Sequence, residues 1–264
     1  MAQVRRAATL RGVTRDRQVV AFVGLAVLFS WAWWIPVARA GGTASHFPGL
    51  LGPMLAAVLV TLGSEGRPGL RRLRGRLGAP RWWLLALSPL VVGAVVVTIS
   101  RAVGGGPSPA SLAHMPGVPA WSWPAVFVVV LLVGGIGEET GWRGLAWHRL
   151  RQRHGLRNAA LLVTVPWAFW HLPLFWIDSG LASLPLYLVP GWLVGLASGA
   201  VVLGWLYERS GSLLVVALAH TAVDMASGTR GTEGLAAAVV SVAVIAAAMA
   251  VLAADRRARA AQTE

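Results

Sequence analysis

Residues 121–142 read WSWPAVFVVVLLVGGIGEETGW, and this stretch decides the fold class. It is long enough to cross the hydrocarbon core of a bilayer as a helix, which takes about 20 mostly apolar residues. Near its end it carries two adjacent acids, Glu138 and Glu139. An ionisable side chain inside a membrane is costly, so each one is a functional hypothesis by default. The stretch therefore predicts both a membrane span and a chemical site.

Working outward, the chain contains further apolar segments of similar length. They lie at 19–38, 48–63, 82–100, 158–177, 185–207, 212–226 and 234–253, and those at 48–63 and 212–226 are short for a span. In a bilayer such segments must be helical, because a helix satisfies its own backbone hydrogen bonds. We predict an all-α, polytopic transmembrane helix bundle of about eight spans, with residues 1–264 forming a single integral-membrane domain.

The arginines give an orientation. All 23 basic residues are arginine, and with eight spans only Arg39, Arg101 and Arg230 fall on the side opposite to the rest. The positive-inside rule then places both termini in the cytoplasm. The net charge of +13 follows this topology, so we expect the lipid bilayer and no nucleic acid as partner. The Ala38-Arg39-Ala40 stretch resembles a signal-peptide cleavage site, but the length of the first segment and its tryptophans favour a retained span.

Composition excludes several kinds of chemistry. Apolar residues make up 56% of the chain and charged residues 12%, against about 25% charged in a soluble domain. There is no cysteine and no lysine, which rules out disulfides, a thiol nucleophile, a P-loop lysine and a Schiff-base lysine. The alanine-, glycine- and arginine-rich composition suggests a GC-rich bacterial gene. We therefore expect a multi-pass protein of a bacterial plasma membrane.

Three short motifs carry the intramembrane ionisable groups. In the first, Glu139 and Arg143 are one helical turn apart and can pair, while Glu138 points elsewhere. The second, WAFWHLP at 167–173, contains His171, and the third, HTAVD at 220–224, puts His220 and Asp224 at i and i+4. Each motif alone also fits a structural charge cluster or a hydrogen-bonded core histidine. Taken together, the three motifs favour a functional site, because they place Glu138, His171 and His220 at a similar depth in the membrane. With a helical rise of about 1.5 Å per residue, these residues lie about 15–21 Å from the predicted cytoplasmic side. Such a cluster can polarise a water molecule, or bind a divalent metal through two imidazoles and a carboxylate.

In order and spacing, these motifs resemble the signature of the CAAX prenyl endopeptidase and bacteriocin-processing proteins (the CPBP or ABI family), which are intramembrane proteases of glutamic or metallo type. The resemblance covers about residues 121–226, the expected catalytic core. Trp167 stands where the family usually has Phe, which we interpret as a packing change. Asp224 stands where the family often has Asn, which adds a possible negative charge.

The resemblance implies roles for six residues. Glu138 would activate a water molecule for attack on a peptide carbonyl, with His171 orienting the water or sharing its activation. His220 and Asp224 would stabilise the oxyanion or bind a metal, and Glu139 and Arg143 would hold the site in shape. If the site holds a divalent metal such as zinc, Glu138, His171 and His220 would be its ligands; no other cofactor is expected. The expected partner is a membrane-associated protein or peptide substrate, whose identity and prenylation the sequence does not give, and neither does it give the oligomeric state.

Other classes of protein remain open. The zincin motif and the rhomboid Gly-x-Ser-Gly motif are absent, and Asp224 is the only intramembrane aspartate, which argues against a paired-aspartate protease. A proton-coupled transporter would be built from repeats with sites in both halves, whereas the ionisable groups here lie in the second half. A non-catalytic immunity or assembly protein with the same fold is the other alternative.

Overall fold

The structure is a computed structural model that describes residues 2–75, 82–104, 106–177 and 179–262. Its helices are α1 (Ala2–Arg39), α2 (Phe47–Leu50), α3 (Gly52–Gly75), α4 (Trp83–Ala102), η2 (Pro109–Ala113), α5 (Trp123–Val129), η3 (Val130–Ile136), α6 (Gly137–Gly141), η4 (Trp142–Trp147), α7 (His148–Leu150), α8 (Leu156–Trp170), η5 (Leu172–Trp176), η6 (Leu186–Leu188), α9 (Val189–Ser210), α10 (Leu213–Ser227) and α11 (Leu235–Ala260). Among the described residues, seven helical stretches are long and apolar enough to cross a membrane, and α10 is a shorter apolar helix beside them. The predicted polytopic helix bundle is thus confirmed.

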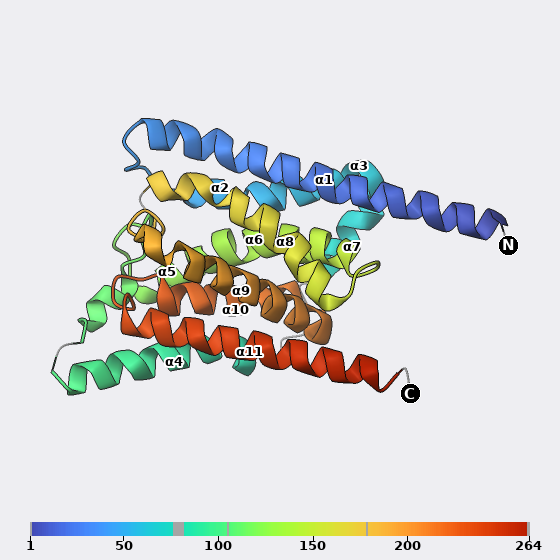
Figure 1. Ribbon diagram of the computed structural model, residues 1–264. Coiled ribbons are helices and arrows are strands. Elements are labelled where there is room, and N and C mark those ends of the chain that lie inside the picture. The colour runs from blue at the N-terminus through green and yellow to red at the C-terminus, as the bar shows by residue number, and fades with distance from the viewer. Residues whose placement is uncertain (1, 76–81, 105, 178, 263–264) are drawn as a thin grey trace.

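The helices pack in an order that leaves the predicted site in the middle. Helix α1 packs against α3 at one edge, and α4 packs against α10 and α11 at the other (Figure 1). Between these edges, α6 contacts α3 and α10, and α8 contacts α9. Helix α1 is an integral part of the bundle, since the indole N–H of Trp170 on α8 donates to Ser30 Oγ at 2.7 Å. That the first span is retained stays a prediction.

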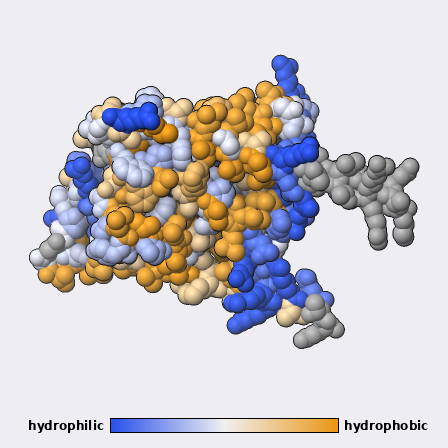
Figure 2. Space-filling view, turned by 45° about the horizontal axis from the view of Figure 1, so that its top comes forward, coloured by the Kyte–Doolittle hydropathy of each residue, from blue (hydrophilic) through white to orange (hydrophobic). Residues whose placement is uncertain are grey.

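Ion pairs tie distant parts of the chain together at one end of the bundle. Arg149 Nη2 contacts Glu65 Oε1 at 2.6 Å, Arg151 pairs with Glu208, and Arg153 pairs with Asp16. These pairs bring the N-terminal helix, the later part of α3, the segment after the fourth span and the end of α9 to the same end of the bundle, as alternating spans require. Both termini also lie at this end (Figure 1). On the face shown in Figure 2, a hydrophobic band lies beside this strongly hydrophilic end. The assignment of this hydrophilic end to the cytoplasm stays a prediction.

The second span is longer than the predicted 48–63 segment. The apolar stretch from Phe47 runs to Leu73, with a break at Gly66. Gly66 has a φ of 64°, a left-handed conformation that glycine adopts without steric cost. Pro68 follows, and proline suits the start of a new helical segment. The break turns the arginine-rich end of α3 away from the axis of its span.

The span that carries the two glutamates departs from a regular α-helix. Residues Val130–Ile136 and Trp142–Trp147 are π-helical and flank the single α-helical turn α6. Such π segments are frequent at functional sites. Glycines on this span allow its neighbours to approach closely. A Cβ atom on Gly135 would lie 2.6 Å from Thr221 Oγ1 on α10, and one on Gly141 would lie 2.6 Å from Phe22 on α1. Helix α6 is therefore enclosed on several sides.

Candidate active site

Both glutamates of α6 are buried. Glu138 is 4% exposed and Glu139 is 0% exposed. Neighbouring residues on a helix point about 100° apart, and both can be interior here because α6 has neighbours on more than one side. A buried carboxylate needs partners, and the two acids find different ones.

Glu139 has two charged or polar partners on one oxygen. Its Oε1 accepts from Arg143 Nη1 at 2.7 Å and from His220 Nδ1 at 2.7 Å. The ion pair expected from the i, i+4 spacing is therefore present, with both side chains fully buried. The second bond links α6 to α10 across 81 positions of the chain. Glu139 thus fixes the orientation of His220, a contact that the sequence analysis did not predict.

His220 and Asp224 are close but are not hydrogen-bonded. The distance from His220 Nε2 to Asp224 Oδ2 is 3.7 Å, which is beyond hydrogen-bond range. The Asp224 side chain is 37% exposed. The expected pair on one face of α10 is therefore within ion-pair distance but not hydrogen-bonded, and the hydrogen bond of the His220 ring is the one from Nδ1 to Glu139.

Glu138 is held by Trp167 on α8. The indole Nε1 of Trp167 donates to Glu138 Oε2 at 2.9 Å, and Trp167 itself is 3% exposed. We expected Trp167 only to pack, but it also forms this hydrogen bond. A signal was available in the sequence, because a buried indole N–H usually finds a hydrogen-bond partner.

His171 stands at the end of α8. The next residue precedes Pro173, and a residue before proline disfavours the α conformation, so the helix ends here and η5 begins. His171 Nδ1 lies 2.7 Å from the main-chain oxygen of Trp167. The rings of His171 and His220 both lie 5.7 Å from the Trp167 ring. Trp167 is thus the common neighbour of both imidazoles and of Glu138.

The hydrogen bonds define the tautomers of both histidines. A carbonyl oxygen or a carboxylate can only accept, so Nδ1 carries the proton in His171 and in His220. In each neutral imidazole, Nε2 is then the basic nitrogen. Both histidines therefore present the same atom for work on a water molecule or a substrate.

A divalent metal on Glu138, His171 and His220 remains a prediction. The donor chemistry suits zinc, since metal-binding histidines usually donate their other ring N–H to a carboxylate or a carbonyl. Within the described part of the chain, however, no three His, Asp or Glu side chains are grouped to hold an ion.

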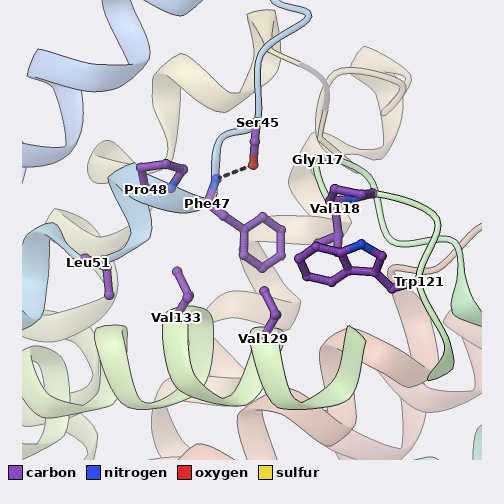
Figure 3. Close-up of a pocket in the computed structure, with 10 residues that line it drawn as sticks. Ser45, Phe47, Pro48, Leu51, Gly117, Val118, Trp121, Val129 and Val133 are labelled. Carbon is purple, nitrogen blue, oxygen red and sulfur yellow. Dashed lines mark hydrogen bonds between the residues drawn. The ribbon is translucent and has the colours of Figure 1, made fainter. Parts of the chain in front are cut away.

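A separate apolar pocket lies beside η3 (Figure 3). Its volume is about 310 Å³, and its lining includes Phe47, Trp121, Val129 and Val133. None of the six predicted site residues lines it. Its edge residue Leu51 also lies against α6, where a Cβ on Gly137 would be 3.4 Å from Leu51 Cδ2. The pocket is therefore next to the turn that carries Glu138.

Glu138, His171 and His220 share Trp167 as a neighbour inside a bundle of apolar helices, an arrangement that agrees with the expected class of intramembrane hydrolase. Comparison with known proteins supports this class. Residues 119–226 match the family described as type II CAAX prenyl endopeptidase Rce1-like. The predicted resemblance to CAAX prenyl endopeptidases is confirmed over this segment, which carries all six predicted site residues.

The chain is also similar to a curated protein, CAAX prenyl protease 2 of Methanococcus maripaludis. The two are 28% identical over 141 residues, which is 50% of each chain. The chain thus matches about half the length of this relative. Both comparisons support an intramembrane endopeptidase as the broad class.

Proposed function

We propose that the protein is an intramembrane endopeptidase in which Glu138 activates a water molecule. One observation carries this proposal: the buried Glu138 carboxylate is held through Oε2 by an indole that also touches His171 and His220. This leaves Glu138 Oε1 as the oxygen available for a water molecule. A positioned carboxylate of this kind is suited to general base catalysis.

The chemistry follows from the protein's own groups. Glu138 accepts a proton from the water, and the water oxygen forms a bond to the carbon of the scissile carbonyl. His171 orients the water through its Nε2. In its protonated form, His220 donates from Nε2 to the oxyanion that develops on the carbonyl oxygen. The C–N bond then breaks as the proton on Glu138 passes to the leaving amine.

Glu139 and Arg143 hold this arrangement in shape. Their fully buried ion pair anchors the carboxylate that fixes His220. Asp224, at 3.7 Å from the His220 ring, adds negative charge near the imidazole without fixing its position.

The substrate we propose is a membrane-associated protein or peptide. The apolar pocket beside α6 (Figure 3) suits a hydrophobic part of such a substrate. The name of the similar protein, a CAAX prenyl protease, makes a peptide with a prenylated C-terminal tail the first probe. The predicted location is a bacterial plasma membrane.

A metal-dependent form of this reaction would use Glu138, His171 and His220 as ligands. A bound zinc ion would supply an acidified water molecule. Elemental analysis of the purified protein separates the two forms: stoichiometric zinc that is lost in His171→Ala and His220→Ala would establish the metal-dependent form.

The decisive experiment compares peptide termini in the membrane proteome of cells that express the native chain or Glu138→Gln at equal levels. Glu208→Gln is the matched control, because Glu208 also accepts an indole N–H, from Trp147 at 3.0 Å, but lies at the end of the bundle. Termini that disappear in Glu138→Gln and persist in Glu208→Gln would identify the cleavage and its substrate.

A farnesylated, internally quenched CAAX peptide serves as a direct assay of the same three proteins in detergent. Full cleavage by Glu138→Gln would overturn the mechanism. Identical termini in all three strains would favour the non-catalytic immunity or assembly role instead.

A further inference from the structure

Trp167 lies at the centre of the candidate site. Its N–H bonds Glu138 Oε2 at 2.9 Å, and the guanidinium carbon of Arg143 lies 4.4 Å from the centre of its ring. Its main-chain oxygen accepts from His171 Nδ1 at 2.7 Å, and its ring meets that of His220 edge-on. One residue thus touches four of the six predicted site residues.

The bond to Glu138 removes a freedom that a carboxylate otherwise has. The terminal torsion of a glutamate is broad, so an unrestrained carboxylate exchanges its two oxygens readily. An indole N–H is a donor only and has a single direction. By bonding Oε2, Trp167 fixes the plane of the carboxylate and singles out Oε1. Phenylalanine would fill much of the same space but has no donor to do this.

We propose that Trp167 is a positioning residue of this enzyme: its indole N–H holds Glu138 with one oxygen free to take the proton of the attacking water. This inference rests on the proposed endopeptidase function. It differs from a packing role in a specific way, because it assigns the effect to one N–H group and not to the volume of the ring.

The test therefore changes the N–H group and keeps the shape. Trp167 is replaced by 3-benzothienylalanine, in which sulfur takes the place of the indole N–H, and separately by Phe. The control is the same pair of replacements at Trp147, a fully buried tryptophan whose N–H bonds Glu208 Oε1 at 3.0 Å. Cleavage of the farnesylated CAAX peptide gives kcat and KM for all five proteins.

Loss of the hydrogen bond is expected to lower kcat by about 10- to 100-fold, the range for a hydrogen bond to a charged group. KM should stay within about twofold, and the unfolding temperature of the benzothienyl protein should remain close to that of the native chain. Both replacements at Trp147 should leave kcat unchanged. Native kcat in the Trp167 benzothienyl protein would overturn the proposal and leave only packing.

A second readout does not depend on activity. The carboxylate stretching band of Glu138, taken as the infrared difference between the native chain and Glu138→Gln, should shift when Trp167 carries benzothienylalanine. No shift would overturn the proposed bond even if the native chain cleaved nothing. Failure of the proposed function has a different signature, namely full activity in Glu138→Gln or no cleavage by the native chain while the band shift persists.

Discussion

His220 Nδ1 on α10 donates to Glu139 Oε1 on α6 at 2.7 Å, and the same oxygen accepts from Arg143. One buried atom therefore links α6, its ion pair with Arg143 and the imidazole of another helix. Glu139 Oε2 and Arg143 Nη2 have no hydrogen-bond partner among the described residues. Glu139 Oε1 is thus the only atom of this ion pair that is hydrogen-bonded to another helix among the described residues.

Removal of the Arg143 guanidinium should lower the stability of the protein severely. Arg143→Met leaves the Glu139 carboxylate without its counter-charge, which costs about 3–5 kcal/mol in a buried pair. The double variant Glu139→Gln/Arg143→Met should regain part of this loss, because no buried charge is left unpaired. Unfolding by SDS in mixed micelles measures both. The control is Arg259→Met, which breaks an exposed i, i+4 pair with Asp255 and should change stability by about 1 kcal/mol or less. Native stability in Arg143→Met would contradict this account.

The two polar residues of α10 should behave differently. His220→Ala should lower kcat by about 100-fold or more, as loss of a donor to the developing oxyanion does. Asp224→Asn should stay within about threefold of native, because the 3.7 Å distance to His220 is too long for a hydrogen bond. Steady-state cleavage of the farnesylated peptide tests both. Equal losses in the two variants would show that Asp224 engages the imidazole during the reaction.

The adjacent glycines Gly134 and Gly135 of η3 allow a matched pair of alanine substitutions. A Cβ on Gly135 would lie 2.6 Å from Thr221 Oγ1 and 2.8 Å from the main-chain oxygen of Ala217, whereas one on Gly134 would meet nothing closer than 3.9 Å. Gly135→Ala should therefore push α10 away from η3, cost about 1–3 kcal/mol as overpacking does, and lower kcat. Gly134→Ala should be tolerated. The same unfolding and cleavage measurements apply, and equal behaviour of the two would refute the close approach.

The orientation in the membrane can be tested directly because the chain has no cysteine. Gln152→Cys and Ala120→Cys introduce single thiols at exposed positions in the loops on either side of the span that carries Glu138. In spheroplasts, a membrane-impermeant maleimide should label Ala120→Cys, and should label Gln152→Cys only after permeabilisation. The reverse pattern would invert the predicted topology.

Hydropathy and arginine placement were enough to predict the bundle, since a bilayer admits few solutions for a chain with such apolar segments. The Glu139–Arg143 pair could also be predicted, because the two residues are one helical turn apart. The pairing of His220 was not, because its partner is on another helix and only packing brings it near. Spacing along α10 favoured Asp224, which is close in sequence but is 3.7 Å from Nε2.

The departure of η3 and η4 from α-helical geometry also could not be predicted, since periodicity rules assume one repeat throughout. The role of Trp167 was overlooked for a different reason. A buried indole N–H needs a hydrogen-bond partner, but the sequence does not say which one, and Glu138 is identified only when α8 is placed beside α6.

The enclosure of α6 has a consequence for how the protein is made. Its glutamates emerge from the ribosome well before His220, and the junction between Glu139 and His220 spans 81 positions. A nascent chain that has not yet inserted α10 carries the acids without the imidazole that completes the site. Under the proposed function, the candidate site would be assembled only when α10 has inserted, and a chain truncated before α10 is expected to be inactive.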